Sequence, residues 1–132
     1  MAIVDGSGCP VSIDIKPASE AEHEHVVDSL DVIESELPEN LVGDAAYDDI
    51  STQLSVAIEY GVNFRAPLRK LHRQQIYDAE ANKRLTQGRW KIERFFAHLK
   101  KFRRLNMRWE YYPENFLAFV KLGASLILFS MF

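Results

Sequence analysis

The chain opens with two short runs rich in β-branched residues, at positions 2–4 and 11–15. Such residues favour extended strands, and the polar segment 5–10 that joins the two runs contains Gly6 and Gly8. Glycine readily adopts the positive φ angles that tight hairpin loops require. The pattern therefore predicts a β-hairpin.

A helical pattern follows the hairpin. It opens at Pro17, with Ser19 as a candidate N-cap. Its apolar positions recur at helical spacing and comprise Val26, Val27, Leu30 and Ile33. The helix should end before Pro38, because proline removes a backbone donor and clashes with the preceding turn.

Residues 40–43 have the pattern of a short strand, and residues 62–66 have that of another. Between them, residues 50–60 show helical spacing, and Gly61 is placed to end that helix in the left-handed conformation. The predicted order over this half of the chain is β-β-α-β-α-β.

A basic connector occupies about residues 66–84, where weak periodicity predicts a loop or a loosely helical segment. A long helix is predicted over about residues 85–104, and Pro113 begins a last one. Alternating strands and helices, followed by two helices, indicate an α/β layered domain, and 132 residues suit a single domain over 1–132.

The apolar run 116–132 is short and is interrupted by Lys121, so we expect a buried terminal helix rather than a membrane span. No cationic n-region precedes a long apolar core, which argues against a signal peptide. The single cysteine, Cys9, excludes an internal disulfide and suits a reducing compartment. A cytoplasmic location without a membrane partner is expected.

Charge is distributed unevenly along the chain. Residues 1–62 carry fourteen acids and one lysine, whereas residues 63–110 carry fourteen lysines or arginines and four acids. A local basic patch can bind phosphates even though the net charge is −3. The basic segment is the predicted DNA face, unless the two oppositely charged faces pair within the fold.

The candidate chemistry begins with Arg89, Glu93 and Lys100, which fall on one narrow stripe of the predicted long helix. The stripe lies at the edge of the apolar arc, where a carboxylate flanked by two cations suits phosphate and metal chemistry. The alternative is a solvent-exposed i,i+4 ion pair between Arg89 and Glu93. A second signal favours the chemical interpretation: residues 41–48, Leu-Val-Gly-Asp-Ala-Ala-Tyr-Asp, place Asp44 directly after an apolar run.

Other chemically suggestive residues have simpler interpretations. His23 and His25 are two positions apart near a helix start, which favours a solvated turn over a metal site. Asp48 and Asp49 suit the N-cap or the first turn of the following helix. Four basic residues could form a plain solvated loop or contact phosphates: Arg65, Arg69, Lys70 and Arg73. Four aromatic residues are more often used for packing in the core or at helix ends than as base-stacking platforms: Trp90, Trp109, Tyr111 and Tyr112.

The two segments resemble the catalytic domain of bacterial insertion-sequence transposases of the DDE class, in the grouping that includes insertion sequences four and five. There the second acid follows a strand, as Asp44 does, and the third is the Glu of a Tyr-x2-Arg-x3-Glu-x6-Lys signature, here Thr86, Arg89, Glu93 and Lys100. Thr86 keeps a hydroxyl but lacks the aromatic ring. The similarity runs from about residue 2 to the end.

The resemblance implies a ribonuclease-H-like α/β fold with two C-terminal helices, and a DNA transposase that cleaves transposon ends and transfers strands into target DNA. Asp44 and Glu93 would be catalytic and would bind two Mg²⁺ or Mn²⁺ ions. The expected phosphate contacts are Arg89, Lys100, Arg69, Lys70 and Arg104. Transposon-end and target DNA, and a second copy of the chain, are the implied partners.

The family's first catalytic Asp lies on a central strand that precedes the hairpin, and Asp5 instead occupies a turn that is not catalytic in the family pattern. The fold is therefore expected to be partial. We expect a truncated or split-frame fragment, inactive alone, that depends on an upstream transposase fragment. The alternative is a non-enzymatic DNA-binding or dominant-negative remnant.

Overall fold

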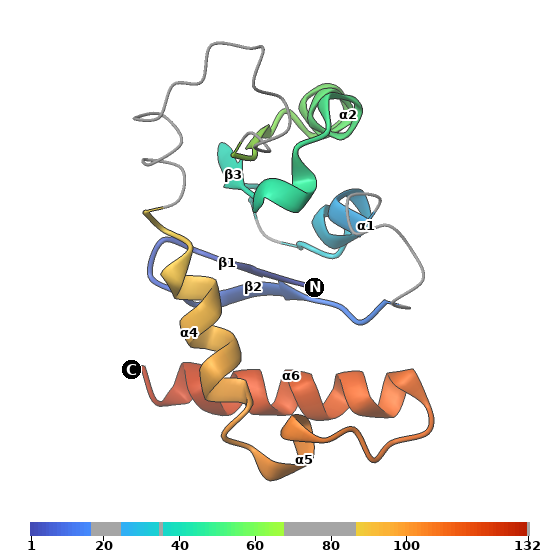
Figure 1. Cartoon of the computed structure of the whole chain (residues 1–132), viewed down its shortest axis with the longest axis vertical. Coiled ribbons are helices and arrows are strands. Elements are labelled where there is room, and N and C mark those ends of the chain that lie inside the picture. The colour runs from blue at the N-terminus through green and yellow to red at the C-terminus, as the bar shows by residue number, and fades with distance from the viewer. Residues whose placement is uncertain (17–24, 35, 68–86, 132) are drawn as a thin grey trace. The chain divides into compact units, whose positions relative to one another are not determined.

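The computed structural model of the chain describes residues 1–16, 25–34, 36–67 and 87–131 (Figure 1). The chain divides into two compact units. The terminal unit combines Met1–Pro17 with Trp90–Phe132, and the central unit is Ala18–Arg89. Each unit has buried apolar residues of its own.

The terminal unit begins with the predicted hairpin. Strands β1 (Ala2–Val4) and β2 (Pro10–Ile13) pair antiparallel, with Ala2 opposite Ile13. Gly8 adopts a φ of +89°, whereas Gly6 does not need a positive φ. The Asp5 carboxylate accepts hydrogen bonds from the backbone N–H groups of Ser7 and Cys9 at 2.8 and 2.9 Å. The hairpin is confirmed, and Asp5 stabilises its turn.

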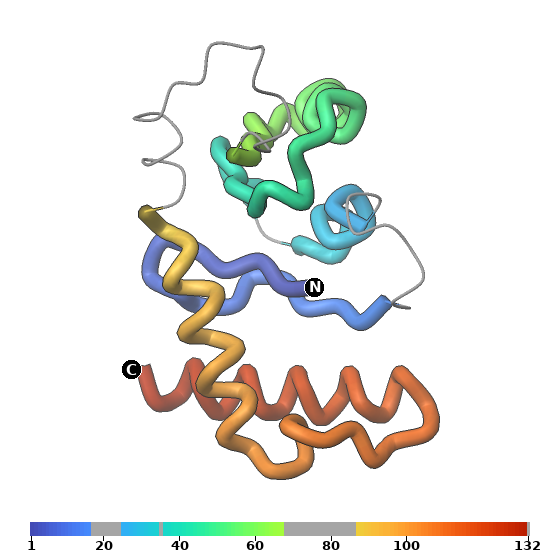
Figure 2. Tube along the Cα trace, in the orientation of Figure 1, coloured from blue at the N-terminus to red at the C-terminus, as the bar shows by residue number. Residues whose placement is uncertain are grey.

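Three helices complete the terminal unit: α4 (Trp90–Leu99), α5 (Arg103–Asn106) and α6 (Pro113–Phe129). Helix α4 crosses α6, and the hairpin packs against both helices (Figures 1 and 2). The buried core consists of Phe95, Leu99, Ala124 and Ile127. Gly123 permits the close approach of these elements, because a Cβ atom there would lie 2.8 Å from Cδ1 of Leu105.

The prediction of one long helix over residues 85–104 was wrong at its C-terminal end. Helix α4 ends at Leu99, and Phe102 adopts an extended backbone conformation, with ψ of 112°, before α5 begins. This break lets Phe102 and Leu105 pack against the core on a different axis from α4. At the other end, residues 87–89 form a turn, and residues 85 and 86 lie outside the described ranges.

Helix α6 begins at Pro113, as predicted, but it is only partly buried. Gly123, Ala124 and Ile127 are buried, whereas Leu122, Leu126 and Phe129 are exposed. The expectation of a buried terminal helix therefore holds for one face alone, because the described residues of the terminal unit cover only that face. None of the helices that the structure describes combines the length and the apolar character needed to cross a membrane.

The central unit contains α1 (His25–Asp31), β3 (Asn40–Val42), the 3₁₀ turn η2 (Ala45–Tyr47), α2 (Ile50–Tyr60) and β4 (Asn63–Arg65). Strands β3 and β4 pair in parallel, with Leu41 opposite Phe64, and α2 provides the crossover between them. The predicted element order is confirmed. Gly61 ends α2 with a φ of +67°, as its position predicted.

The core of the central unit lies where α1, α2 and β4 meet. Its most buried side chains are Val26, Leu30, Val56, Val62 and Phe64. At the exposed edge, the Tyr60 hydroxyl donates a 2.5 Å hydrogen bond to Asp31, and this bond raises the pKa of Tyr60 to about 12. The hydroxyl therefore stays protonated, and able to tie α2 to α1, throughout the neutral range.

Within the described residues the strands form two separate two-stranded sheets, β1–β2 and β3–β4. The mixed α/β class is thus confirmed. The proposed start of α1 at Pro17, including the Ser19 cap, lies outside the described residues, as does all of the basic connector beyond Pro67.

Asp49 is the N-cap of α2, as its sequence position predicted. Its Oδ2 atom accepts hydrogen bonds from Thr52 N at 2.8 Å and from the hydroxyls of Ser51 and Thr52, both at 2.6 Å. We expect Asp49→Ala to lower the free energy of unfolding by about 1 kcal/mol, because the first turn loses its acceptor. Circular dichroism of thermal unfolding measures this loss. Asp49→Asn, which keeps an acceptor, should retain most of the stability, and equal losses would argue against a capping role.

Candidate functional site

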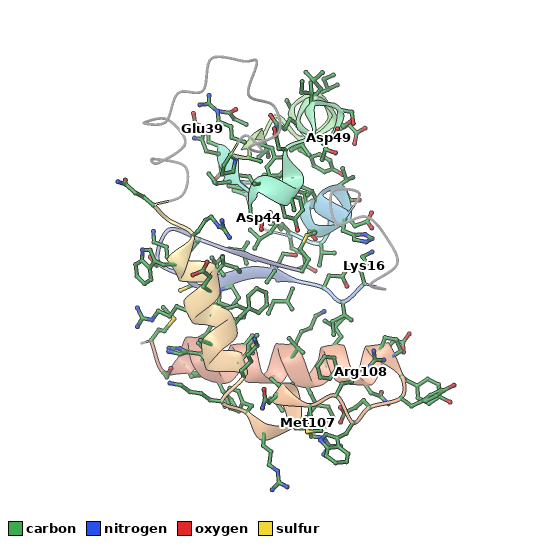
Figure 3. The ribbon with its side chains drawn as sticks, in the orientation of Figure 1. Lys16, Glu39, Asp44, Asp49, Met107 and Arg108 are labelled. Carbon is green, nitrogen blue, oxygen red and sulfur yellow. The ribbon has the colours of Figure 1, made fainter. Side chains whose placement is uncertain are left out.

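Asp44 lies just beyond the end of β3, at the start of η2. Its Oδ1 atom accepts a 2.6 Å hydrogen bond from Ala46 N, and the side chain is 43% exposed (Figure 3). Gly43 continues the strand ladder through a 2.9 Å bond from its N–H to Arg65 O. A Cβ atom at Gly43 would lie 3.1 Å from the Phe64 ring, so a small residue is favoured before the carboxylate.

Arg89 reaches Asp44 within the central unit. The Nη2 atom of Arg89 lies 3.8 Å from Oδ2 of Asp44, and the Arg89 side chain is 38% exposed. At this distance and exposure the attraction contributes about 0–1 kcal/mol. The structure therefore places Arg89, the arginine of the Arg-x3-Glu-x6-Lys spacing, beside Asp44. It leaves both side chains accessible to solvent.

Glu93 and Lys100 belong to the terminal unit. Glu93 is exposed in the first turn of α4, next to the half-buried Ile92. Lys100 follows the last residue of α4, and its N–H still bonds to Phe96 O at 3.0 Å, so the helical turn continues to this residue. A spacing of seven residues places Glu93 and Lys100 on the same side, two turns apart. The helix thus fixes the direction of the Glu93 Cα–Cβ bond within its unit.

Carboxylates such as Asp44 and Glu93 are the ligand type that Mg²⁺ and Mn²⁺ prefer. Among the residues that the structure describes, however, no three His, Cys, Asp or Glu side chains are grouped so that they could hold a metal ion. The donor chemistry of each carboxylate fits a divalent cation.

Several predicted site residues lie outside the described ranges: His23, Arg69, Lys70, Arg73 and Thr86. His25 is buried in α1, with its Nδ1 atom 3.8 Å from Oδ2 of Asp28, so the prediction of a solvated turn was wrong for this residue. Asp48 ends η2, where its N–H bonds to Ala45 O, rather than serving as a cap of α2.

Arg104, an expected phosphate contact, forms an ion pair that the sequence analysis missed. Its Nε atom lies 2.6 Å from Oε1 of Glu110, and its guanidinium carbon lies 4.3 Å from the ring centroid of Phe119. Arg104 holds the pKa of the Glu110 carboxyl below its usual value. The six-residue separation crosses an irregular segment, so helical periodicity could not reveal this pair.

Four aromatic side chains were interpreted as more often core or helix-end packing than base-stacking platforms. Their exposure contradicts packing in the core, whereas the Tyr111 and Tyr112 rings pack edge to face with centroids 5.2 Å apart. Trp90 is 52%, Trp109 70%, Tyr111 87% and Tyr112 62% exposed. Short-range periodicity offers no signal for Trp109, Tyr111 and Tyr112, because they lie between α5 and α6, whereas Trp90 is the first residue of α4.

The two candidate carboxylates occupy different kinds of element, Asp44 after a strand of the parallel pair and Glu93 in helix α4, and Arg89 lies 3.8 Å from Asp44. The chain belongs to the transposase DDE domain family, whose model matches residues 1–128. Its family function is therefore DNA transposition and recombination. Neither the curated proteins nor the solved structures contain a significant match.

Proposed function

We propose that the chain forms the C-terminal part of the catalytic domain of a DNA transposase in the grouping of insertion sequences four and five, with a ribonuclease-H-like arrangement in the complete protein. The substrates are transposon-end and target DNA. The observation that carries the proposal is the family match over residues 1–128, together with Asp44 at a strand end and Glu93 on a helix. A cytoplasmic location follows from a DNA substrate.

Asp44 and Glu93 are the proposed catalytic carboxylates and ligands of Mg²⁺ or Mn²⁺. When bound, such ions activate the attacking oxygen and stabilise the leaving oxygen of a phosphodiester. Arg89 lies 3.8 Å from Asp44 and supplies positive charge beside it, where a phosphate would otherwise be repelled by the carboxylate. Lys100 supplies a second cation on the Glu93 side of α4.

Catalysis in this proposal requires a third carboxylate, which an upstream transposase fragment would provide. Two divalent ions need several carboxylate ligands, more than Asp44 and Glu93 alone supply. Without that carboxylate, the chain alone would not cleave DNA. The complete protein would act as a homodimer on paired transposon ends.

One feature favours a second candidate function, a DNA-binding or dominant-negative remnant without catalysis. Both oxygens of Asp44 already have protein neighbours, since Oδ1 caps η2 and Oδ2 faces Arg89. These contacts would stabilise the fold even if Asp44 had no catalytic role. Binding of DNA would persist in this case because phosphate contacts depend on the basic side chains.

Duplex binding should depend steeply on salt, and replacement of exposed cations should reduce that dependence. Each neutralised phosphate contributes about −0.9 to the slope of log K against log salt. We expect Lys100→Gln combined with Lys101→Gln to flatten the slope by up to about 2, measured by fluorescence anisotropy with a labelled duplex. Arg69 and Lys70 are expected to act similarly.

Lys121→Gln is the matched control, because Lys121 is an exposed cation on α6, outside the basic segment. This variant should retain the slope of the unmodified chain. An affinity that is independent of salt in all three proteins would refute phosphate binding by this surface, and with it the proposed DNA-binding function.

A further inference from the structure

A pocket of about 410 Å³ lies in the terminal unit and is lined by Arg103, Arg104 and Trp109. Its volume falls within the range of small-ligand sites, roughly 300–1,000 Å³. Two of the lining residues come from α5, and the third comes from the extended segment 107–112 that leads into α6. The pocket is largely open to solvent and its lining is mostly apolar. Its lining residues are two arginines and a tryptophan whose side chain is 70% exposed.

Polar contacts hold the segment 107–112 in place. Glu110, whose side chain is only 6% exposed, accepts the 2.6 Å bond from Arg104. Arg108, labelled in Figure 3, donates from Nε to Glu110 O at 3.0 Å and from Nη2 to Tyr111 O at 3.2 Å. These contacts fix the backbone on both sides of Trp109. The Trp109 indole is therefore exposed on a segment whose backbone is held by hydrogen bonds and an ion pair.

The cations of residues 100–108, two of which line the pocket, fall into two groups. Arg104 and Arg108 are held by Glu110 and by backbone carbonyls. By contrast, Lys100, Lys101 and Arg103 are exposed, and no described residue forms an ion pair or a side-chain hydrogen bond with them. Three cationic side chains can therefore neutralise ligand phosphates without first breaking a contact within this part of the protein.

We propose that this pocket binds an unpaired nucleotide, with its base stacked on Trp109 and its phosphates on Arg103 and Lys101. An indole offers a flat π surface to a base whose own face is free, and the faces of bases inside a duplex are already stacked. Neighbouring cations that follow the backbone complete the chemistry of single-strand recognition. The inference goes beyond the proposed function, because an inactive chain would bind unpaired DNA in the same way.

The test compares a single-stranded oligonucleotide with a blunt duplex of the same length, at one salt concentration. Trp109→Ala is expected to weaken binding of the single strand roughly 5- to 150-fold, the range found for loss of one stacked base. Duplex affinity should stay unchanged. Phe129→Ala removes an 81% exposed aromatic side chain at the C-terminal end of α6, about 24 Å along the helix axis from Pro113, and should alter neither affinity.

A spectroscopic measurement that does not depend on removing the indole accompanies the affinities. In Trp90→Phe, the remaining Trp109 fluorescence should be quenched by the single strand and not by the duplex. In Trp109→Phe, the Trp90 fluorescence should be insensitive to the single strand. Trp109→Phe should also bind the single strand with intermediate affinity, because a smaller aromatic ring retains part of the stacking surface.

The inference is overturned if Trp109→Ala weakens single strand and duplex equally, or if Trp109 fluorescence is unaffected by the single strand. A chain that binds the single strand through Trp109 but fails to bind duplex would support the inference while refuting the duplex-binding part of the proposed function. The two ideas can therefore fail separately.

Discussion

Asp44→Asn and Glu93→Gln are each expected to abolish metal-dependent cleavage of a transposon-end duplex, when the chain is assayed together with the polypeptide that carries the family's first Asp. We expect a loss of more than about 100-fold, because even groups that only orient metal ligands contribute about 10–100-fold. Gel analysis of the labelled duplex with Mg²⁺ or Mn²⁺ measures the cleavage.

These substitutions are chosen so that folding is preserved. Asn at position 44 can still accept the hydrogen bond from Ala46 N that caps η2. Glu93 is exposed on α4, so an amide there leaves no buried group unsatisfied. Duplex binding should persist in both variants, and loss of binding would instead indicate a structural role for the carboxylate.

Asp49→Asn is the matched control for the acids near β3, because Asp49 caps α2 and is not a proposed ligand. Its cleavage should equal that of the unmodified protein. The chain alone should show no cleavage. Robust nicking by the chain alone, lost in Asp44→Asn, would contradict the requirement for a further carboxylate and would establish a complete site in this chain.

Phe95→Ala should destabilise the terminal unit by about 3–5 kcal/mol, the usual cost of removing a buried phenyl ring. Phe95 is 3% exposed and belongs to the core formed by α4 and α6. Because the total stability of a small domain is about 5–15 kcal/mol, a loss of this size removes much of it. Urea unfolding of both proteins measures the difference.

The neighbouring Phe96 provides a control of the same residue type on the same helix. It is 39% exposed, so Phe96→Ala should cost far less than Phe95→Ala. Trp90 and Trp109 both lie in the terminal unit, and their fluorescence therefore reports unfolding of this unit. Equal destabilisation by the two substitutions would show that the described packing of α4 is incorrect.

Features that depend on a few neighbouring residues were predictable from the sequence. The hairpin follows from β-branched runs around a loop that contains Gly8, and Gly8 takes the positive φ that only glycine adopts easily. The Asp49 cap and the Gly61 end of α2 are likewise local, since each partner lies within four residues. The placement of Asp44 after a strand has the same origin.

The end of α4 was not predictable, because the apolar pattern continues through Phe102 and Leu105. Helical periodicity records only that these residues are apolar at suitable intervals. Their packing on the core beside Gly123 requires a backbone break at Phe102, and contacts with α6 determine where that break occurs. Tertiary packing thus overrides a local helical preference.

By itself the sequence determined the element order from β1 to β4, the two caps of α2, the positions of Asp44 and Glu93 on their elements, and the similarity to the family. These follow from local spacing and motifs. Only the tertiary structure decided that Arg89 meets Asp44, that Arg104 pairs with Glu110, and that Trp109 is exposed. Such contacts and exposures depend on how separate segments pack against one another. The spacing of residues within one segment does not specify that packing.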